Sequence, residues 1–270
     1  IVINVEHKLS QYADDTEFLL AGDKTSFENC IHAVETFGHK SGLYMNPSKT
    51  SAIWLGSRKN STVRYMEHLG MEWNPPRFKI LGVWFTNDLQ NCQHMNYTET
   101  LADVKHLFKI WVKRQLTPLG RVAILKSLIL SKLIHLWILL PNPPEHFFVA
   151  LQKHCYRFVW NNKQDKINRK TVHKSVKNGG LGLPELKNFA SSLKLSWLRK
   201  FQTTKHKWKS IVSSNFPLLS DMQNYGPEIF STFSKSNVFW TEVFDAYKDF
   251  FLQSGLYKLR GTPCRTCVLQ

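Results

Sequence analysis

Hydrophobic residues recur at every second position at the start of the chain. Ile1, Ile3 and Val5 follow this spacing, and a second apolar run begins at Phe18 after a short acidic stretch. Two apolar runs around a short polar centre are typical of a strand–turn–strand unit. We therefore predict a β-hairpin over residues 1–22.

A helix is predicted after this hairpin. Thr25 and Glu28 fit a capping box, in which each side chain satisfies a free backbone N–H at the helix start. Gly42 is suited to end the helix, because glycine readily adopts the left-handed conformation at that position. At helical spacing, one apolar stripe would face the core. Its members are Phe27, Cys30, Ile31, Val34 and Phe37.

Short extended segments are expected next. The chain breaks at Pro47, and residues 50–55 are predicted as a strand, whereas residues 57–77 are polar and mostly loop. Residues 78–85 are predicted as a short strand or a hairpin, interrupted by Gly82. A glycine inside a strand indicates a bulge or a close backbone approach.

The apolar period changes to 3.6 residues from about residue 97, which predicts helices. We expect them near 97–116, 119–140 and 144–160, with prolines at the two breaks, followed by a basic, loop-rich stretch over 161–184. Beyond about residue 204 the pattern weakens to short apolar and aromatic clusters. Before that, a further helix is expected, whose apolar side consists of Leu186, Phe189, Ala190, Leu193 and Trp197.

These elements predict an α+β fold in three parts. Residues 1–90 combine strands with a helix, residues 91–160 are helical, and residues 161–270 form a basic, mainly helical extension. The chain has 270 residues, of which 43% are hydrophobic and 13% aromatic, so a sizeable core can form.

Charge is distributed unevenly along the chain. Residues 1–100 contain 9 Lys and Arg against 11 Asp and Glu, whereas residues 101–270 contain 27 against 9. The total of +16 favours a polyanionic partner, either nucleic acid or an anionic membrane surface. A basic surface that is merely solvated is an equally open alternative.

Three lysines of the predicted helix at 97–116 are candidates for a contact with phosphates. Lys105, Lys109 and Lys113 stand four residues apart and would share one helix face. Such a stripe can face phosphates, although a solvated face is at least as common.

A membrane span is not expected. Residues 122–141 are strongly apolar but contain Lys126 and Lys132, whose charges are costly inside a bilayer, so we predict a buried amphipathic helix. No signal peptide is visible at the start of the sequence. We expect an intracellular location, with the nucleus as one option.

The five cysteines do not form a disulfide framework and suit a reducing compartment. Cys264 and Cys267 have the spacing of half a zinc site, which needs four ligands. An unpaired motif is the alternative, because no suitable partners follow.

The most specific chemistry is carried by Tyr12-Ala13-Asp14-Asp15. Adjacent carboxylates on a tight hairpin can bind Mg²⁺, and two such ions roughly 3.5–4 Å apart can activate an attacking 3′ oxygen and stabilise the leaving phosphate. The alternative is a plain acidic turn, because Asp is favoured in turns.

This motif does not stand alone. The helix after it leads to residues 41–50 (SGLYMNPSKT), and residues 78–82 (FKILG) come next. In order and spacing, these segments resemble the YADD, SGL-N-KT and K-x-LG motifs of reverse transcriptases of LINE-type, non-LTR retrotransposons. Residues 117–121 (TPLGR) and 179–184 (GGLGLP) resemble later segments of the same family, so the resemblance covers roughly residues 1–200.

The resemblance implies a fold and an activity. Residues 1–90 would be the C-terminal part of a polymerase palm, residues 91–160 a helical thumb, and residues 161–270 a basic extension. The implied activity is RNA-directed DNA synthesis, in which a primer 3′-OH attacks a dNTP with Mg²⁺ as the cofactor. The implied partners are an RNA template and a DNA primer.

The resemblance also implies roles for residues of the first part. Asp14 would be the main Mg²⁺ ligand, with Asp15 in support, and Tyr12 would lie near the primer terminus or the templating pair. Residues 81–82, Leu81 and Gly82, would contact the primer. Lys49 would protonate the leaving pyrophosphate, with an ordinary surface lysine as the alternative.

The helical part would grip duplex through phosphates without reading sequence. The residues assigned to this contact are Lys105, Lys109, Lys113 and Arg121.

The family's active site also needs an Asp from an earlier palm strand and an upstream fingers region. Only 11 residues precede Tyr12. We therefore expect a fragment that lacks this upstream polymerase segment and is nearly inert as a polymerase alone. The alternative is a retroelement-derived module that binds nucleic acid without catalysis.

Overall fold

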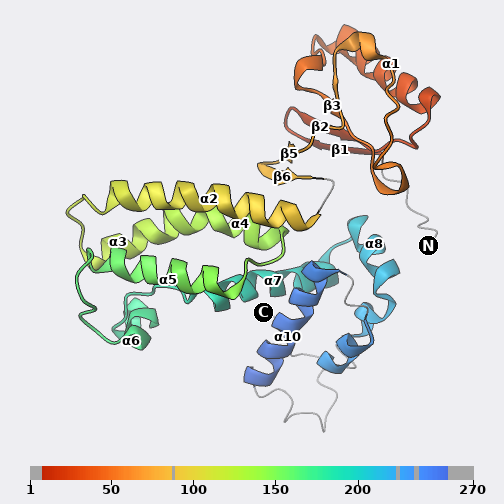
Figure 1. Ribbon diagram of the computed structural model, residues 1–270. Coiled ribbons are helices and arrows are strands. Elements are labelled where there is room, and N and C mark those ends of the chain that lie inside the picture. The colour runs from red at the N-terminus through yellow and green to blue at the C-terminus, as the bar shows by residue number, and fades with distance from the viewer. Residues whose placement is uncertain (1–7, 87–88, 223–225, 234–236, 255–270) are drawn as a thin grey trace. The chain divides into compact units, whose positions relative to one another are not determined.

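The structure is a computed structural model that describes residues 8–86, 89–222, 226–233 and 237–254. The chain forms two compact units that divide between Cys92 and Gln93. Helices predominate in the described residues, and the strands there form two-stranded sheets (Figure 1). The predicted α+β class is confirmed.

The first unit begins with a hairpin. Strands β1 (Leu9–Tyr12) and β2 (Asp15–Phe18) pair antiparallel, with Tyr12 opposite Asp15. This confirms the predicted strand–turn–strand unit in its described part. The alternating Ile1, Ile3 and Val5 lie outside the described residues.

Helix α1 (Lys24–Ser41) follows, but the predicted capping box is wrong. The cap is Asp23, whose carboxylate accepts hydrogen bonds from the Ser26 backbone N–H at 2.8 Å and the Ser26 hydroxyl at 2.7 Å. One carboxylate satisfies both donors, so Thr25 lies inside the first turn. The helix ends as predicted at Gly42, which has φ of 77°.

The core of the first unit is aromatic. Trp54 is buried, and its ring lies near those of Tyr65 and Trp73 at centroid distances of 5.8 and 5.9 Å. Phe27 of α1 contacts the same cluster, whereas Phe37, predicted to be buried, is 57% exposed. Tyr65 and Trp73, which lie in the stretch predicted to be mostly loop, therefore supply packing surface for the start of α1.

Two further strand pairs complete this unit. β3 (Ser51–Ala52) pairs parallel with β4 (Glu72–Trp73), so the strand predicted over 50–55 is shorter than expected. β5 (Phe78–Ile80) and β6 (Val83–Phe85) form a hairpin, which was one of the two predicted alternatives. Short 3₁₀ turns lie at Pro47–Lys49, Gly56–Arg58 and Glu67–Leu69.

The second unit is helical. Its longer elements are α2 (Leu89–Trp111), α3 (Pro118–Ile124), a π-helical segment (Leu125–Leu130), α4 (Ser131–Leu139), α5 (Glu145–Val159), α6 (Arg169–His173), α7 (Leu186–Thr203), α8 (Trp208–Asn215) and α10 (Val238–Ser254). Further 3₁₀ turns lie at Val176–Asn178, Pro217–Asp221 and Gly226–Thr232.

Helix α2 starts earlier and ends earlier than predicted. Its buried side includes Cys92, Asn96 and Tyr97, two of which carry polar groups, so the apolar period is hidden there. The breaks at the prolines are as predicted. Thr117 caps α3 by accepting a hydrogen bond from the Gly120 N–H at 3.1 Å.

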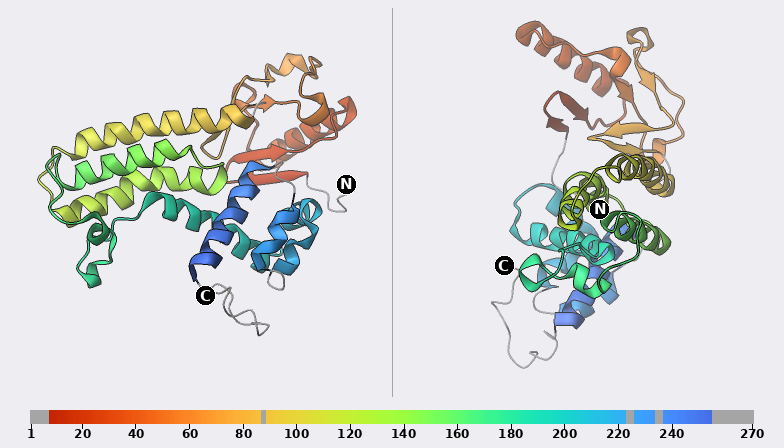
Figure 2. Two further views of the ribbon diagram at one scale, coloured as in Figure 1. Left: turned by 60° about the horizontal axis from the view of Figure 1, so that its bottom comes forward. Right: turned by 90° about the vertical axis from the view of Figure 1, so that its left-hand side faces the viewer.

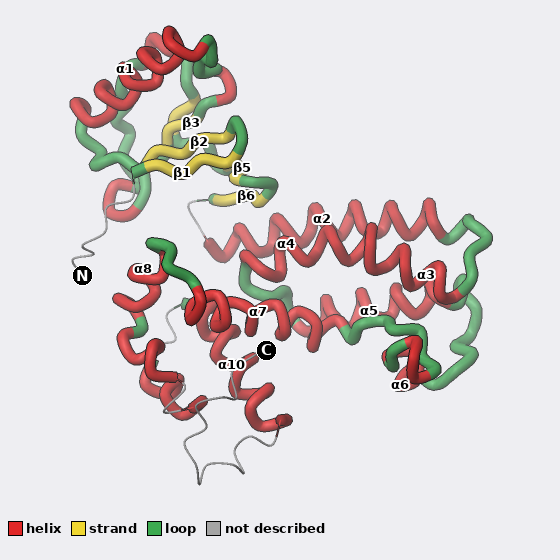
Figure 3. The backbone as a smooth tube through the Cα atoms, turned by 180° about the vertical axis from the view of Figure 1, so that it is seen from behind, coloured by secondary structure: helices red, strands yellow, loops and turns green. Residues whose placement is uncertain are grey.

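Helices from both predicted C-terminal parts share one core. Helix α7 follows residue 160, but it packs against α4 and α5, which precede this residue. It also packs against α10, which comes later in the chain. Figures 2 and 3 show this arrangement from further directions. The predicted boundary after residue 160 therefore does not separate two compact units in the described chain.

The end of this unit packs through aromatic rings. Phe230 stacks on Phe244 with centroids 4.6 Å apart, and Phe216, Phe233 and Trp240 contact the Phe244 ring. Phe230 belongs to a 3₁₀ turn, Trp240 and Phe244 belong to α10, and Phe216 and Phe233 flank 3₁₀ turns. Between residue 204 and α10 the helical elements are short, so a helical period has little length over which to develop, which explains the weak sequence pattern there.

The segment Pro118–Leu139 is long and apolar enough to cross a membrane by length and composition alone. In the second unit, however, its side chains Leu125, Ile129, Leu133 and Trp137 are completely buried. This agrees with the predicted buried amphipathic helix.

A buried lysine interrupts the apolar side of α7. Leu186 and Ala190 are buried as predicted, but the buried face continues through Lys194 rather than Leu193. The Lys194 ammonium donates to the Leu140 carbonyl, lies 3.5 Å from the Glu242 carboxylate and stands over the Phe239 ring.

Both ends of this ion pair are strongly desolvated. Burial lowers the pKa of Lys194 to about 8 and raises the pKa of Glu242. The Glu242 carboxylate also accepts the Asn142 backbone N–H at 2.8 Å. The pair thus joins α7, α10 and the α4–α5 connection.

Removing one member of this pair is expected to be worse than removing both. Glu242→Leu leaves the Lys194 ammonium buried without a counter-charge, which costs about 3–5 kcal/mol of unfolding free energy. Lys194→Met combined with Glu242→Leu removes both charges and should cost less than Glu242→Leu alone. Urea denaturation of the unmodified chain, Lys194→Met, Glu242→Leu and the double variant measures this, and a double-variant loss equal to the sum of the two single losses would contradict it.

Candidate nucleic-acid interface

The two carboxylates of the first unit lie at the tip of the β1–β2 hairpin. Ala13 and Asp14 form the two-residue turn, and Asp15 is the first residue of β2. Both aspartates are exposed, and Tyr12 is 70% exposed. The turn therefore presents both carboxylates to solvent.

The turn is also strained. Ala13 has φ of 54°, which is a left-handed conformation that costs a non-glycine residue about 1 kcal/mol. Primed turns with positive φ match the twist of antiparallel strands, which explains why this conformation occurs at a two-residue hairpin.

These carboxylates fit a Mg²⁺ ion only in part. Mg²⁺ is commonly held by one or two carboxylates together with water and substrate phosphates, so the donor chemistry is suitable. Within the residues that the structure describes, however, no group of three or more His, Cys, Asp or Glu side chains could hold a metal ion. Asp14 and Asp15 would thus need donors from a substrate or another segment.

Lys49 lies in the same unit at the end of a 3₁₀ turn. Asn46 caps this turn by accepting the Ser48 N–H at 3.1 Å, and Lys49 is exposed. No hydrogen bond or ion pair joins Lys49 to Asp14 or Asp15 in the described chain. Its assigned role stays a prediction.

Leu81 and Gly82 form the turn of the β5–β6 hairpin. Their φ values are 46° and 85°, as a type I′ turn requires at both central positions. A Cβ atom added at Gly82 would meet nothing within 4 Å. Within this chain, Gly82 therefore serves the turn geometry rather than a close backbone approach.

In the second unit, exposed cations of two helices gather where α2 and α5 pack. Phe108 of α2 contacts the rings of His154 and Phe158 of α5, at centroid distances of 6.0 and 5.4 Å. Lys105 and Lys109 flank Phe108 along α2 and are exposed. Lys113, the third predicted member, is also exposed but follows the helix end at Trp111.

Helix α5 adds two cations that the sequence analysis did not single out. Lys153 and Arg157 are exposed and stand four residues apart, and this spacing was the available signal. We call Lys105, Lys109, Lys153 and Arg157 the α2/α5 basic surface. No ion pair neutralises any of these four in the described part of the chain.

His154 reports the electrostatic potential of this surface. Burial, together with the nearby cations Arg157, Lys105 and Lys153, holds the pKa of His154 below its usual value. The α2 and α5 cations therefore act on one common point, which makes a phosphate at this place favourable.

Arg121 does not belong to this surface. Its side chain is 2% exposed, and its guanidinium donates to the carbonyls of Arg114 at 2.9 Å and Phe158 at 3.2 Å. Longer hydrogen bonds reach the carbonyls of Val112 and Leu116. The predicted phosphate contact is thus corrected, because the four hydrogen bonds of the Arg121 guanidinium are made to the chain between α2 and α3 and to the end of α5.

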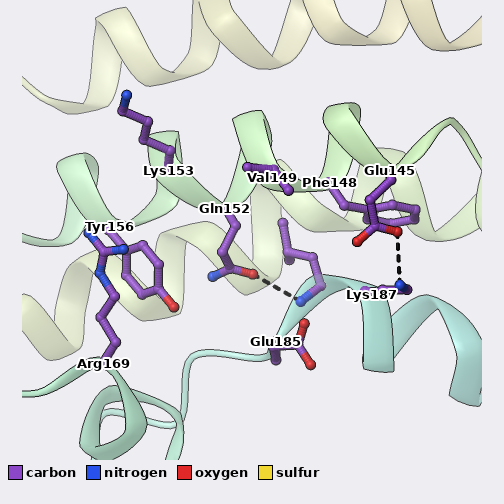
Figure 4. Close-up of a pocket in the computed structure, with 10 residues that line it drawn as sticks. Glu145, Phe148, Val149, Gln152, Lys153, Tyr156, Arg169, Glu185 and Lys187 are labelled. Carbon is purple, nitrogen blue, oxygen red and sulfur yellow. Dashed lines mark hydrogen bonds and ion pairs between the residues drawn. The ribbon is translucent and has the colours of Figure 1, made fainter.

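A cavity of about 510 Å³ lies between α5, α6 and the start of α7. Its charges are mostly paired, because Lys187 lies 2.8 Å from Glu145 and Arg169 lies 2.8 Å from Asp165. Gln152 accepts the Leu186 N–H at 3.0 Å (Figure 4). The cavity therefore has mixed charge, and it shares Lys153 with the α2/α5 basic surface.

No protein-family model matches the chain. Cys264 and Cys267 lie outside the described residues, so neither the unpaired motif nor the half zinc site is tested.

Arg121→Met is expected to lower the unfolding free energy by about 2–3 kcal/mol, because several carbonyls lose a charged donor. Lys109→Met should change stability by less than about 0.5 kcal/mol, because Lys109 is exposed. Urea denaturation compares the two variants. A stable Arg121→Met protein with weakened nucleic-acid binding would restore the phosphate role.

The pKa of His154 should rise when phosphates bind near it. NMR titration of the His154 ring, with and without a saturating RNA–DNA hybrid, measures this shift. Arg157→Gln is the matched control, because removing one repelling cation should raise the pKa of His154 in the free protein. An unchanged pKa in the complex would place the nucleic acid elsewhere.

Proposed function

We propose that the chain is part of an RNA-directed DNA polymerase related to those of LINE-type, non-LTR retrotransposons. The observation that carries this proposal is the exposure of Asp14 and Asp15 at a two-residue hairpin turn. A plain acidic turn would explain the exposure, but not the ordered motifs that follow along the sequence. In this proposal, the first unit is the C-terminal part of a palm and α2 to α5 are a thumb.

The roles of the first unit follow from this assignment. Asp14 and Asp15 would hold Mg²⁺, which when bound lowers the barrier for attack by a primer 3′ oxygen on a dNTP phosphate. Tyr12, at the end of β1, would contact the primer terminus. Leu81 and Gly82 would contact the primer backbone through the exposed turn.

The proposed active site is incomplete in the described residues. Two carboxylates and no third metal ligand give too few donors for a two-ion site. We expect templated primer extension by this chain alone to be close to background. A further carboxylate supplied by another polymerase segment would complete the site.

A second candidate function is nucleic-acid binding without catalysis. The α2/α5 basic surface favours it, because four exposed cations without internal partners suit a phosphate backbone. This function would need neither Asp14 nor the turn at residues 81–82.

Crosslinking from the primer 3′ end separates the two functions. An RNA template paired with a DNA primer that ends in a photoreactive thymidine analogue should crosslink to residues 9–18 or 78–85. Moving the photoreactive group to the primer 5′ end is the control and should abolish these crosslinks. Crosslinks confined to the helical unit would contradict the polymerase assignment and favour the second function.

A further inference from the structure

Residues 161–178 form a second cluster of exposed positive charge, here named the basic segment. It contains the five exposed lysines Lys163, Lys166, Lys170, Lys174 and Lys177. Arg169 is also exposed, but it is paired with Asp165 at 2.8 Å and stands over the Tyr156 ring. No ion pair neutralises the five lysines in the described part of the chain.

The start of the basic segment is fixed by a tight turn. Asn161 and Asn162 have φ of 52° and 60°, which is the left-handed conformation that asparagine tolerates better than most residues. The Asn162 N–H donates to the Arg157 carbonyl at 2.7 Å. The chain is thereby turned away from α5 at a defined point.

The end of the basic segment is held by the glycine-rich turn after it. The N–H of Gly182 donates to the Lys174 carbonyl at 2.8 Å. A Cβ atom at Gly180 would lie 2.1 Å from the same carbonyl, so only glycine allows this approach. The backbone that carries Lys174 and Lys177 is therefore closely packed rather than free.

Side chains anchor the basic segment to α5. His173 Nδ1 lies 2.7 Å from the Leu183 carbonyl, which requires an N–H at Nδ1. Nε2 then accepts the Tyr156 hydroxyl hydrogen at 2.6 Å. Val172, between these lysines, is completely buried.

A sixth lysine comes from a different element. The Lys126 ammonium lies beside the glycine-rich turn, 3.4 Å from the position that a Gly182 Cβ would occupy. Lys126 is exposed and belongs to the π-helical segment. The fold therefore places the positive charge of Lys126 beside the positive charges of the basic segment.

We propose that the basic segment, together with Lys126, is a second phosphate-binding surface for nucleic acid, separate from the α2/α5 basic surface. Anchored lysines lose less conformational freedom on binding a polyanion than lysines of a free loop. The inference rests on the proposed nucleic-acid function and deepens it, because it predicts a footprint longer than one surface can cover.

An anionic membrane is the less favoured partner. Interfacial membrane binding combines cations with large exposed apolar side chains. Here the neighbouring aromatics Tyr156 and Trp160 are buried, and the exposed apolar side chains are the small Val176 and the 38% exposed Ile167. A phosphate backbone needs only the cations.

Two charge-matched variants test the proposal. One changes Lys166, Lys170, Lys174 and Lys177 to Gln, and the other changes Lys105, Lys109, Lys153 and Arg157 to Gln. A third variant, Lys132→Gln with Lys187→Gln, removes lysines that are already paired with Asp103 and Glu145. Binding to a long RNA–DNA hybrid is measured across a series of salt concentrations, and circular dichroism checks folding.

The basic-segment variant should reduce the slope of log affinity against log salt by about two units or more, since each lost phosphate contact removes about 0.9. The paired-lysine variant should leave the slope nearly unchanged. An unchanged slope in the basic-segment variant alone would overturn the inference while leaving the proposed function intact. No measurable binding by the unmodified chain would instead overturn the proposed function.

Binding to vesicles with and without phosphatidylserine tests the alternative partner, an anionic membrane. We expect the unmodified chain and the basic-segment variant to bind them equally weakly. Strong binding that the basic-segment variant loses would assign the surface to a membrane and contradict the nucleic-acid proposal. A Lys→Arg version of the same four positions keeps the charge and should retain nucleic-acid binding.

Discussion

Excess positive charge in the helical unit is the constraint on which the rest of the structure depends. Among the described residues of this unit two cations are buried, and a different kind of partner neutralises each. Arg121 is surrounded by backbone carbonyls, and Lys194 is paired with Glu242. Most of the remaining cations must stay at the surface, because burying an unpaired charge costs far more than a domain can supply.

Several of the exposed cations lie in two clusters. Lys105, Lys153 and Arg157 act together on His154, and the lysines of the basic segment share one anchored stretch of backbone. Self-repulsion within such clusters is unfavourable in the free protein. A polyanion relieves it, which is why charge placement is the most informative functional feature of this unit.

The first unit shows how far local sequence chemistry can predict structure. Both hairpins and the end of α1 at Gly42 were predictable, because turns and caps depend on a few neighbouring residues. The cap at Asp23 was missed because Thr25 offered a competing match two residues later. The exposure of Phe37 was not predictable, since it depends on how far the aromatic cluster of Trp54, Tyr65 and Trp73 extends along α1. The polymerase roles of Asp14, Asp15 and Lys49 remain predictions.

The helical unit was predictable in kind but not in detail. Asn96 and Lys194 are polar but lie on buried helix faces, where partners from other segments satisfy them. A prediction from apolar spacing alone therefore misplaces the start of α2 and the buried face of α7. Arg121 looked like a surface cation for the same reason, because its carbonyl partners come from segments distant in sequence. Lys153 and Arg157 could be assigned to the α2/α5 basic surface only from the packing of α2 on α5, which the sequence does not show.

We propose that this charge binds a nucleic-acid backbone. The most direct test is the affinity of the unmodified chain for an RNA–DNA hybrid at increasing salt. A phosphate-dominated interface predicts a steep linear fall of log affinity with log salt, with a slope of about −3.6 if the four cations of the α2/α5 basic surface each contact a phosphate. An affinity that does not respond to salt would contradict the account.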